Sequence, residues 1–219
     1  MNLGNVMILG DSFSTFEGYI PNGYATYYKN GGHENTDVAD VSQTWWYMLF
    51  KENEANLVLN SSYSGTTICN TGYGGKDLSD ISFVARMDKL IEENWFSDNK
   101  IDTLFIFGGT NDSGACSPMG EFKFTDFEKQ DLYYIAPALC YLIKRAKKAL
   151  PDTRIIFIIN YYIKPEIIET IKTACKELNI ECLKLETVQI NNSHPTIKGM
   201  IGIKEQIAEY LASAEKEKL

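Results

Sequence analysis

Short apolar runs alternate along the chain with longer segments of helical periodicity. The runs are rich in Val, Ile, Leu and Phe with little polar alternation, as in strands buried on both faces of a parallel sheet. These runs lie at residues 6–9, 57–59, 103–107, 154–159 and 181–185. Between them, apolar residues recur three or four positions apart, which indicates helices with one buried face. The helical segments lie at residues 83–91, 135–146, 167–178 and 197–211.

This order of elements predicts an α/β fold. Strands that alternate with helices form βαβ units, which make the sheet parallel and cover both of its faces. We therefore expect a five-stranded parallel sheet flanked by helices. No repeat, linker or shift in composition marks a second domain, so residues 1–219 are expected to form a single domain. Ligands of such sheets bind beyond the carboxyl ends of the strands, and candidate chemistry is therefore expected there.

Four polar segments lie at that edge of the predicted sheet. They are residues 10–14 (GDSFS), 60–65 (NSSYSG), 108–112 (GGTND) and 193–196 (SHPT). Each alone has an ordinary explanation, because Asp, Ser and His-Pro are common where a helix begins. Together they contain the parts of an acyl-transfer site: a serine hydroxyl at a strand-to-helix turn, a histidine base, and Gly and Asn donors for an oxyanion.

The four segments resemble, in the same order, the sequence blocks of the SGNH/GDSL hydrolase family. The resemblance spans nearly the whole chain and implies a flavodoxin-like three-layer α/β/α sandwich. It also implies a serine hydrolase that cleaves carboxylic esters through an acyl-enzyme, with no cofactor and no metal. By this resemblance Ser12 is the nucleophile and His194 the catalytic base. The oxyanion hole would be formed by the N–H groups of Ser12 and Gly65 and the side chain of Asn111.

One position departs from the family pattern. Members usually carry Asp three residues before the His, and Asn191 stands there in this chain. Asn can hold the imidazole in some protease triads, but replacing Asp by Asn in a serine protease lowers kcat about 10⁴-fold. Three cases stay open: Asn191 orients His194, a backbone carbonyl does so, or the protein is a weak enzyme. Asp11 and Asp112 are less favoured alternatives for the acid role, and Asp11 is expected instead to brace its turn.

The segment between residues 13 and 50 is rich in aromatic residues and glycine. Long loops in compact domains usually carry function. Trp45 and Trp46 are expected to begin a helix, with at least one of them in the core. Tyr19 and Tyr24 are the candidates for substrate binding, since aromatic faces suit sugars and acyl chains. A small ester is therefore the expected partner, and an acetylated carbohydrate is the favoured candidate.

Composition narrows the remaining classes of function. The 219 residues carry 21 Lys and Arg against 29 Asp and Glu, a net charge of -8, which argues against nucleic acid as a partner. The 5 cysteines are scattered without a CxxC pair, which argues against a disulfide framework or a zinc site. No apolar run reaches the length of a membrane helix or a secretory signal, so no membrane partner and a cytoplasmic location are expected.

Two other functions would use the same residues. A catalytically weakened relative could bind glycans or acyl ligands, which the Asn at position 191 would explain. An acyltransferase could pass the acyl group to a sugar acceptor instead of water. The sequence specifies neither the acyl group, nor the alcohol, nor the oligomeric state.

Overall fold

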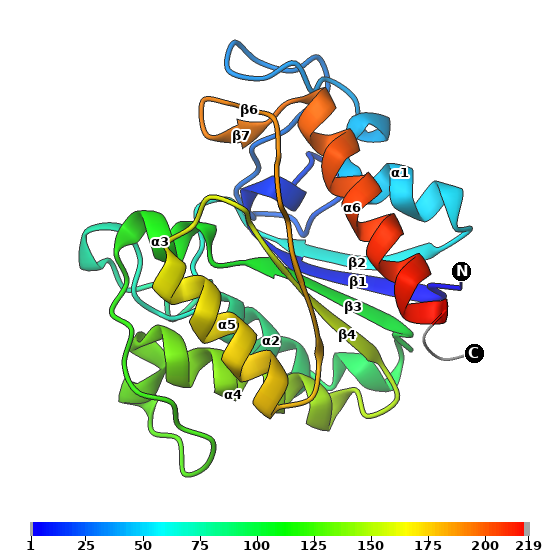
Figure 1. Cartoon of the computed structure of the whole chain (residues 1–219). Coiled ribbons are helices and arrows are strands. Elements are labelled where there is room, and N and C mark those ends of the chain that lie inside the picture. Colours follow the sequence, from blue (N-terminus) through cyan, green and yellow to red (C-terminus); the bar gives the residue numbers. More distant parts are fainter. Residues whose placement is uncertain (1, 217–219) are drawn as a thin grey trace.

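A computed structural model describes residues 2–216 of the chain (Figure 1). Its central sheet has 5 parallel strands in the order β2-β1-β3-β4-β5. The strands are β1 (Asn5–Gly10), β2 (Asn56–Ser62), β3 (Thr103–Gly108), β4 (Arg154–Ile159) and β5 (Glu181–Lys184). The predicted α/β fold with a five-stranded parallel sheet is therefore confirmed. The ends of each predicted strand differ from the observed ends by at most about three residues.

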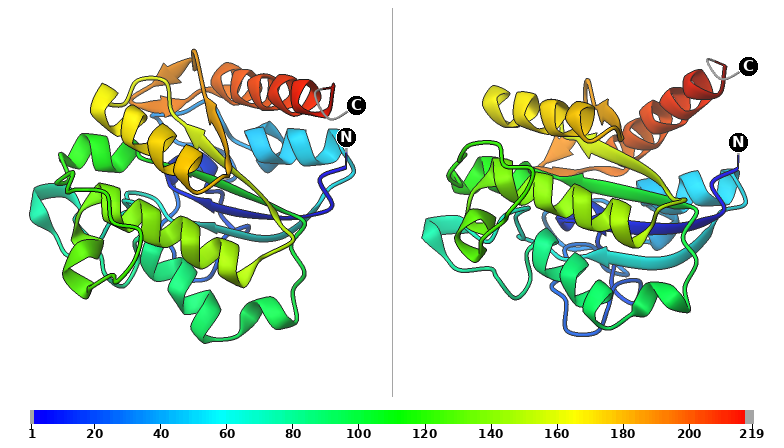
Figure 2. Two further views of the ribbon diagram at one scale, coloured as in Figure 1. Left: turned by 60° about the horizontal axis from the view of Figure 1, so that its bottom comes forward. Right: turned by 90° about the horizontal axis from the view of Figure 1, so that it is seen from below.

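Helices cover both faces of the sheet, as Figures 1 and 2 show. One face carries α2 (Phe83–Glu92), α4 (Ile135–Ala149) and α5 (Pro165–Glu177). The other carries α1 (Trp45–Glu52) and α6 (Ile197–Lys216). The shorter elements are α3 (Thr110–Ala115), the strands β6 (Ile190–Asn191) and β7 (His194–Pro195), and the 3-10 helices η1 (Ser12–Ser14), η2 (Val41–Gln43), η3 (Tyr73–Gly75), η4 (Trp95–Ser97) and η5 (Lys129–Tyr133). The result is the predicted three-layer α/β/α sandwich.

Alternate side chains of each inner strand enter different halves of the core. In β1, Met7 and Leu9 pack with α2, α4 and α5, whereas Val6 and Ile8 pack with α1 and α6. Both faces are buried, which is why the strands have continuous apolar runs rather than polar alternation. Within the described residues, no helix has the length and apolar character needed to cross a membrane.

The aromatic helix α1 contributes heavily to this core. Trp45 is 0% exposed and Trp46 is 1% exposed, so both tryptophans are buried, where at least one was expected. Their indole N–H groups donate to the hydroxyl and the carbonyl oxygen of Ser14, at 3.2 and 3.0 Å. The helix therefore holds the turn that follows β1 as well as filling the core.

The strand order places the sequence blocks side by side. β1 lies between β2 and β3, so the turn after Gly10 emerges between the segments that follow those two strands. A Cβ added at Gly10 would lie 2.6 Å from Ser62 Oγ on β2, which explains why this position has no side chain. The carboxyl edge of the sheet thus brings together the segments that follow β1, β2 and β3.

Candidate active site

Ser12 lies in the first turn after β1, in the 3-10 helix η1. Asp11 caps this turn, because its Oδ1 accepts a hydrogen bond from the N–H of Phe13 at 3.0 Å. The Thr15 hydroxyl donates to the Ser12 carbonyl oxygen at 3.0 Å. These local bonds fix the backbone around a serine that is buried except for 5% of its surface. Asp11 braces the turn, as expected.

His194 lies directly against this serine. Its Nε2 is 2.9 Å from Ser12 Oγ, and its Nδ1 is 3.1 Å from the carbonyl oxygen of Asn192. A carbonyl oxygen can only accept, so Nδ1 must carry the ring proton. The lone pair of Nε2 is then free to accept the hydroxyl hydrogen of Ser12. This is the tautomer that a general base for Ser12 requires.

Of the partners left open for His194 Nδ1, the structure places a backbone carbonyl there, that of Asn192, and not the side chain of Asn191. Asn191 pairs with His194 across the hairpin of β6 and β7, and its side chain is exposed. The two residues between these strands, Asn192 and Ser193, have φ of 44° and 65°. Positive φ at both positions is the pattern of a type I′ turn, which Asn tolerates well. This turn directs the Asn192 carbonyl oxygen toward the imidazole.

The hairpin is held in place by the segment that precedes α1. Asn35 Oδ1 accepts from Asn192 Nδ2 at 2.8 Å, and Asp37 Oδ1 accepts from the first N–H of α6 at 2.8 Å. The Tyr28 hydroxyl donates to the Pro195 carbonyl oxygen at 3.0 Å. The hairpin has only two residues in each strand and would be unstable alone. Its contacts with residues 28–37 therefore hold it in position.

Aromatic rings enclose the imidazole of His194. The Tyr27 ring stacks on it with centroids 3.4 Å apart and an interplanar angle of 7°, and the Phe13 ring lies at 5.7 Å. Burial lowers the pKa of His194 below 6.5, and His33 lowers it further, whereas the Asn192 carbonyl acts in the opposite direction. His194 is therefore neutral, and able to accept a proton, at neutral pH.

Asn111 lies at the start of α3, directly after β3. Its Nδ2 donates to the carbonyl oxygen of Thr66 at 3.0 Å, and its Oδ1 accepts from the Tyr73 hydroxyl at 3.2 Å. The reversed amide would place Oδ1 against the Thr66 carbonyl, so these two partners fix its orientation. The second hydrogen of Nδ2 remains available to a ligand in the cavity that Asn111 lines with Ser12.

Gly65 lies on the exposed loop after β2 with a φ of +82°, a conformation that favours glycine. It is not among the residues that line the cavity beside Ser12. Its neighbour Thr66 contacts Asn111 through the carbonyl oxygen. The structure thus brings Ser12, His194 and Asn111 together, with the Gly65 loop adjoining Asn111.

The buried Arg86 of α2, a residue not predicted from the sequence, ties the first two blocks together. Its Nη2 donates to the Gly10 carbonyl oxygen and to Thr66 Oγ1, each at 3.1 Å, and its Nη1 donates to the Ser61 carbonyl oxygen. Burial lowers its pKa to about 10, so it stays charged at neutral pH. The available signal in the sequence was that Arg86 stands among the apolar positions of its helix, where a charged side chain is buried only if it has partners.

A cavity of about 320 Å³ opens beside Ser12 and His194. Tyr73, Tyr162 and Ile163 form walls of it, and none of its lining residues is an Asp, Glu, Lys or Arg. Tyr73 and Tyr162 are 53% and 39% exposed, which leaves ring surface open to a ligand. Neither tyrosine was singled out from the sequence.

The two tyrosines that were expected to bind substrate do not line this cavity. The Tyr19 ring packs against Phe16 and Trp46, with centroids 6.1 and 5.7 Å away. The Tyr24 ring packs against Tyr63 at 4.9 Å. Both occupy the segment after the nucleophile as expected, but their rings contact other aromatic side chains beside the site.

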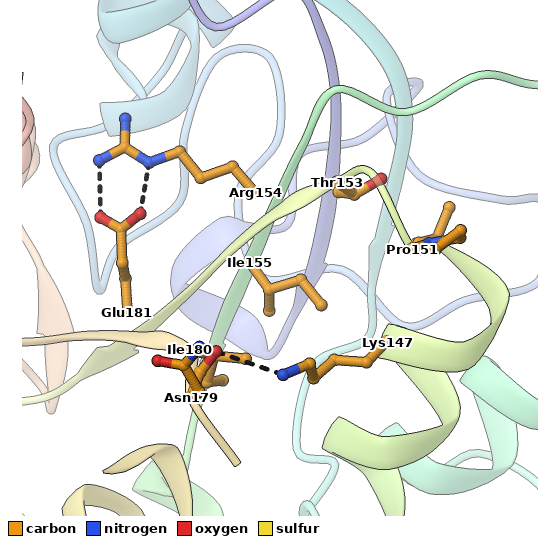
Figure 3. Close-up of a pocket in the computed structure, with 9 residues that line it drawn as sticks. Lys147, Pro151, Thr153, Arg154, Ile155, Asn179, Ile180 and Glu181 are labelled. Carbon is orange, nitrogen blue, oxygen red and sulfur yellow. Dashed lines mark hydrogen bonds and ion pairs between the residues drawn. The ribbon is translucent and has the colours of Figure 1, made fainter.

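A larger cavity of about 550 Å³ lies at the opposite edge of the sheet, where β4 and β5 begin (Figure 3). Arg154 and Glu181 form a two-pronged ion pair there, at 2.7 and 2.6 Å. Lys147 donates to the carbonyl oxygens of Leu178 and Asn179, and Figure 3 draws the second of these bonds. The charged residues of this larger cavity are therefore bonded to protein partners. The candidate site is the smaller cavity, because Ser12 and His194 line it.

Two buried carboxyls flank the site without contacting His194. Burial raises the pKa of Asp11 to about 7, against the opposing effect of its bond to the Phe13 N–H. Burial also raises the pKa of Asp112 to about 6, while it accepts from the N–H groups of Ile68 and Cys69 at 2.9 and 3.3 Å. Both brace loops. Among the described residues, no three His, Cys, Asp or Glu side chains gather as metal ligands would.

Comparison with known proteins identifies the family. The family model described as GDSL-like Lipase/Acylhydrolase matches residues 4–211. A solved structure described as a GDSL-like lipase from Bacteroides ovatus is 42% identical, with a TM-score of 0.90, over 97% of this chain and 100% of that chain. A second, from Bacteroides uniformis, is 36% identical with a TM-score of 0.89, over 96% of each chain.

More distant structures share the fold alone. An acetyl xylan esterase from Butyrivibrio proteoclasticus is 14% identical with a TM-score of 0.64, over 99% of this chain and 65% of that chain. No curated protein matches the chain significantly. The family model and the two Bacteroides structures nevertheless cover almost the whole chain. The chain therefore belongs to the GDSL-like lipase/acylhydrolase family, the SGNH hydrolases.

Proposed function

We propose that this protein hydrolyses carboxylic esters of short acyl groups through an acyl-enzyme on Ser12. The observation that carries the proposal is the 2.9 Å contact between Ser12 Oγ and His194 Nε2, with the proton of the imidazole held on Nδ1 by a main-chain carbonyl. A neutral imidazole in this tautomer is ready to accept the hydroxyl proton of Ser12.

The reaction follows from these positions. Ser12 Oγ attacks the ester carbonyl carbon while its proton moves to His194 Nε2. The negative oxygen of the tetrahedral intermediate is bound by the N–H group of Ser12 and by Asn111 Nδ2. The family resemblance adds the N–H group of Gly65, whose loop adjoins Asn111 through Thr66. The carbon–oxygen bond to the alcohol then breaks, and the alcohol leaves with the proton from His194. A water molecule, deprotonated by His194, releases the acid in the same way and restores Ser12.

The Asn192 carbonyl oxygen takes over the orienting part of the missing carboxylate. It holds Nδ1–H both in the free enzyme and in the imidazolium. This arrangement favours the hydrolase over the weakened binding protein, because the base is held without any contribution from Asn191. In this proposal Asn191 does not fill the role of the triad acid, although it stands at that position in the sequence.

The cavity supports a small, uncharged acyl group and a neutral alcohol. Its volume of about 320 Å³ and its lack of ionised lining residues match an acetyl ester better than a long-chain or anionic one. The open faces of Tyr73 and Tyr162 suit a sugar ring, which packs its C–H groups on aromatic surfaces. An acetylated carbohydrate is therefore the proposed natural substrate class.

Hydrolysis of p-nitrophenyl acetate and of acetylated sugars by the wild type, Ser12→Ala and Ser213→Ala tests the proposal. Ser213 is exposed on α6 and its hydroxyl donates to the nearby Tyr210 carbonyl oxygen, far along the chain from Ser12, which makes it a matched serine control. We expect the wild type and Ser213→Ala to release acetate at equal rates and Ser12→Ala to be inactive. Full activity in Ser12→Ala would refute the assignment. Transfer of acetate to an added sugar in preference to water would identify an acyltransferase.

A further inference from the structure

The Tyr27 ring covers one face of the catalytic imidazole. The two rings are nearly parallel, at 7°, with centroids 3.4 Å apart. The other aromatic neighbours of His194 differ in geometry, because Phe13 is tilted by 50° at 5.7 Å and Tyr28 presents an edge at 6.4 Å. Among the described aromatic side chains, Tyr27 is thus the one whose π face lies flat against His194.

The main chain of Tyr27 is fixed to the nucleophile turn. Its N–H donates to Thr15 Oγ1 at 2.9 Å, and the same hydroxyl donates to the Ser12 carbonyl oxygen at 3.0 Å. Its carbonyl oxygen accepts from His33 Nε2 at 3.0 Å. One hydroxyl therefore links the Ser12 main chain to the residue that stacks on His194, so the nucleophile and the ring that covers its base share a single scaffold.

Among the described residues no carboxylate contacts the His194 imidazole, and the Tyr27 ring can supply part of the missing negative potential. When Ser12 attacks, His194 becomes an imidazolium, and the family's Asp would supply a full negative charge beside it. The Asn192 carbonyl supplies only a dipole. The face of an aromatic ring carries partial negative charge and attracts a cation placed over it, more strongly where water is excluded.

We propose that Tyr27 is a positioning residue that holds the His194 ring in line with Ser12 and stabilises its imidazolium through the aromatic face. This inference rests on the proposed function, since it concerns the base of that reaction. It assigns to a residue of the segment after the nucleophile a part of the role that a carboxylate fills elsewhere in the family.

The titratable groups around His194 are consistent with this role. Tyr27 and Tyr28 are phenols whose pKa is raised by burial, and burial also raises the pKa of Tyr162, whose hydroxyl donates to the carbonyl oxygen of Ser193 in the turn. All three remain neutral at working pH. The His33 ring packs against the Tyr27 ring with centroids 4.9 Å apart and an interplanar angle of 79°, and His33 lowers the pKa of His194. The Tyr27 face and the Asn192 carbonyl oxygen therefore both place negative potential against the imidazole.

The test compares Tyr27→Phe with Tyr27→Leu, using p-nitrophenyl acetate between about pH 4.5 and 9. Phe keeps the ring face and should keep kcat within about twofold, whereas Leu should lower kcat roughly tenfold with little change in KM, the equivalent of one such interaction. The acid limb of the Leu profile should move down by about one pH unit, because the imidazolium is less stable. Tyr47→Leu, which removes a ring that packs on Trp46 in α1, is the control and should behave as the wild type.

Three results would overturn the inference. Tyr27→Leu could match the wild type in kcat and pH profile, Tyr27→Phe could lose as much as Leu, or the loss could lie in KM alone. Melting temperatures of all variants are measured alongside, and Tyr27→Met replaces the Leu variant if the latter does not fold. Ser12→Ala in the same assay separates the two levels of failure. If it remains active, the proposed function is wrong; if it is inactive and the Tyr27 variants are unaffected, only this inference is wrong.

Discussion

Ser12 Oγ and His194 Nε2 are 2.9 Å apart although 182 positions separate the two residues in the chain. The distance is set by two short structures at opposite ends of the sequence. A capped 3-10 turn after the first strand presents the serine, and a two-residue turn with positive φ presents the histidine. The same turn supplies the carbonyl oxygen that fixes the imidazole tautomer, so position and protonation of the base have one cause.

Substitution of Asn191 tests whether that turn, rather than a side chain, holds the base. The Asn191 side chain is exposed and the Nδ1 partner is the Asn192 carbonyl. We therefore expect Asn191→Ala and Asn191→Asp to keep kcat within about twofold, against the roughly 10⁴-fold effect of losing a triad carboxylate. In contrast, Asn192→Val should lower kcat about tenfold, because a β-branched residue resists the φ of 44° at that position. A collapse of activity in Asn191→Ala would return the orienting role to Asn191.

The pH profile of kcat/KM should report the burial of His194. Burial lowers its pKa below 6.5, and only the neutral ring can accept the Ser12 proton. Activity should therefore be fully developed at neutral pH and fall as the pH drops through an inflection below 6.5. Initial rates on a neutral ester across this range give the inflection. A single acid limb centred above 6.5 would mean that a different group, or an uncovered His194, controls the rate.

Asp11→Asn should stabilise the protein at alkaline pH. The folded state raises the pKa of Asp11 from 3.8 to about 7 through burial, so the folded form binds this proton more tightly than the unfolded chain. Stability from this proton is complete below pH 3.8 and is lost as the pH rises through about 7. Asn keeps the acceptor for the Phe13 N–H without the charge. We expect a gain on the order of 2 kcal/mol in unfolding free energy at pH 8 and far less at pH 4, measured by urea denaturation.

The control for this prediction is Asp80→Asn, which neutralises an exposed carboxylate. It should change stability little at either pH, since exposed charges contribute little. If Asp11→Asn destabilised the fold equally at both pH values, the carboxylate would be held ionised by partners other than those seen here.

Tyr73→Phe probes the oxyanion side of the site. The Tyr73 hydroxyl donates to Asn111 Oδ1 at 3.2 Å, which helps to aim and polarise the amide N–H. Loss of an oxyanion donor costs about 10²–10³ in kcat, so we expect Asn111→Ala to fall in that range and Tyr73→Phe to lose about five- to tenfold. Combined in one protein, the second change should add nothing to the first. Tyr133→Phe, whose hydroxyl reaches the exposed Asp77 instead, is the matched control. Additive losses in the double variant would show that the Tyr73 hydroxyl acts directly on the substrate.

Most of the fold could be predicted because its strands are buried on both sides. The apolar runs of β3 and β4 leave no polar face, and the helices between strands keep a regular apolar stripe. Pro165 also begins α5, where a proline fits because the first N–H of a helix has no partner. These features depend on neighbours in the sequence or on burial alone.

The parts of the site that the sequence left open or missed depend on contacts between distant segments. The hairpin of β6 and β7 has two residues in each strand and a polar sequence, too short for any periodicity. The carbonyl oxygen of Asn192 is a main-chain atom, and every residue has one, so the residue type at position 192 does not indicate that it binds His194. Tyr73 and Tyr162 reach the cavity from loops after β2 and β4, and Tyr27 was one tyrosine among several in its segment. Only the folded arrangement distinguishes these residues from others of the same type.

The acyl-enzyme itself gives the most direct test of the central claim that Ser12 and His194 form a nucleophile and its base. The protein is mixed with p-nitrophenyl acetate, quenched in acid during turnover, digested, and examined by mass spectrometry. We expect one acetyl group on the peptide that contains Ser12, and a strongly reduced rate of its formation in His194→Ala. An acetyl group on another residue, or wild-type turnover with Ser12 unmodified, would contradict it.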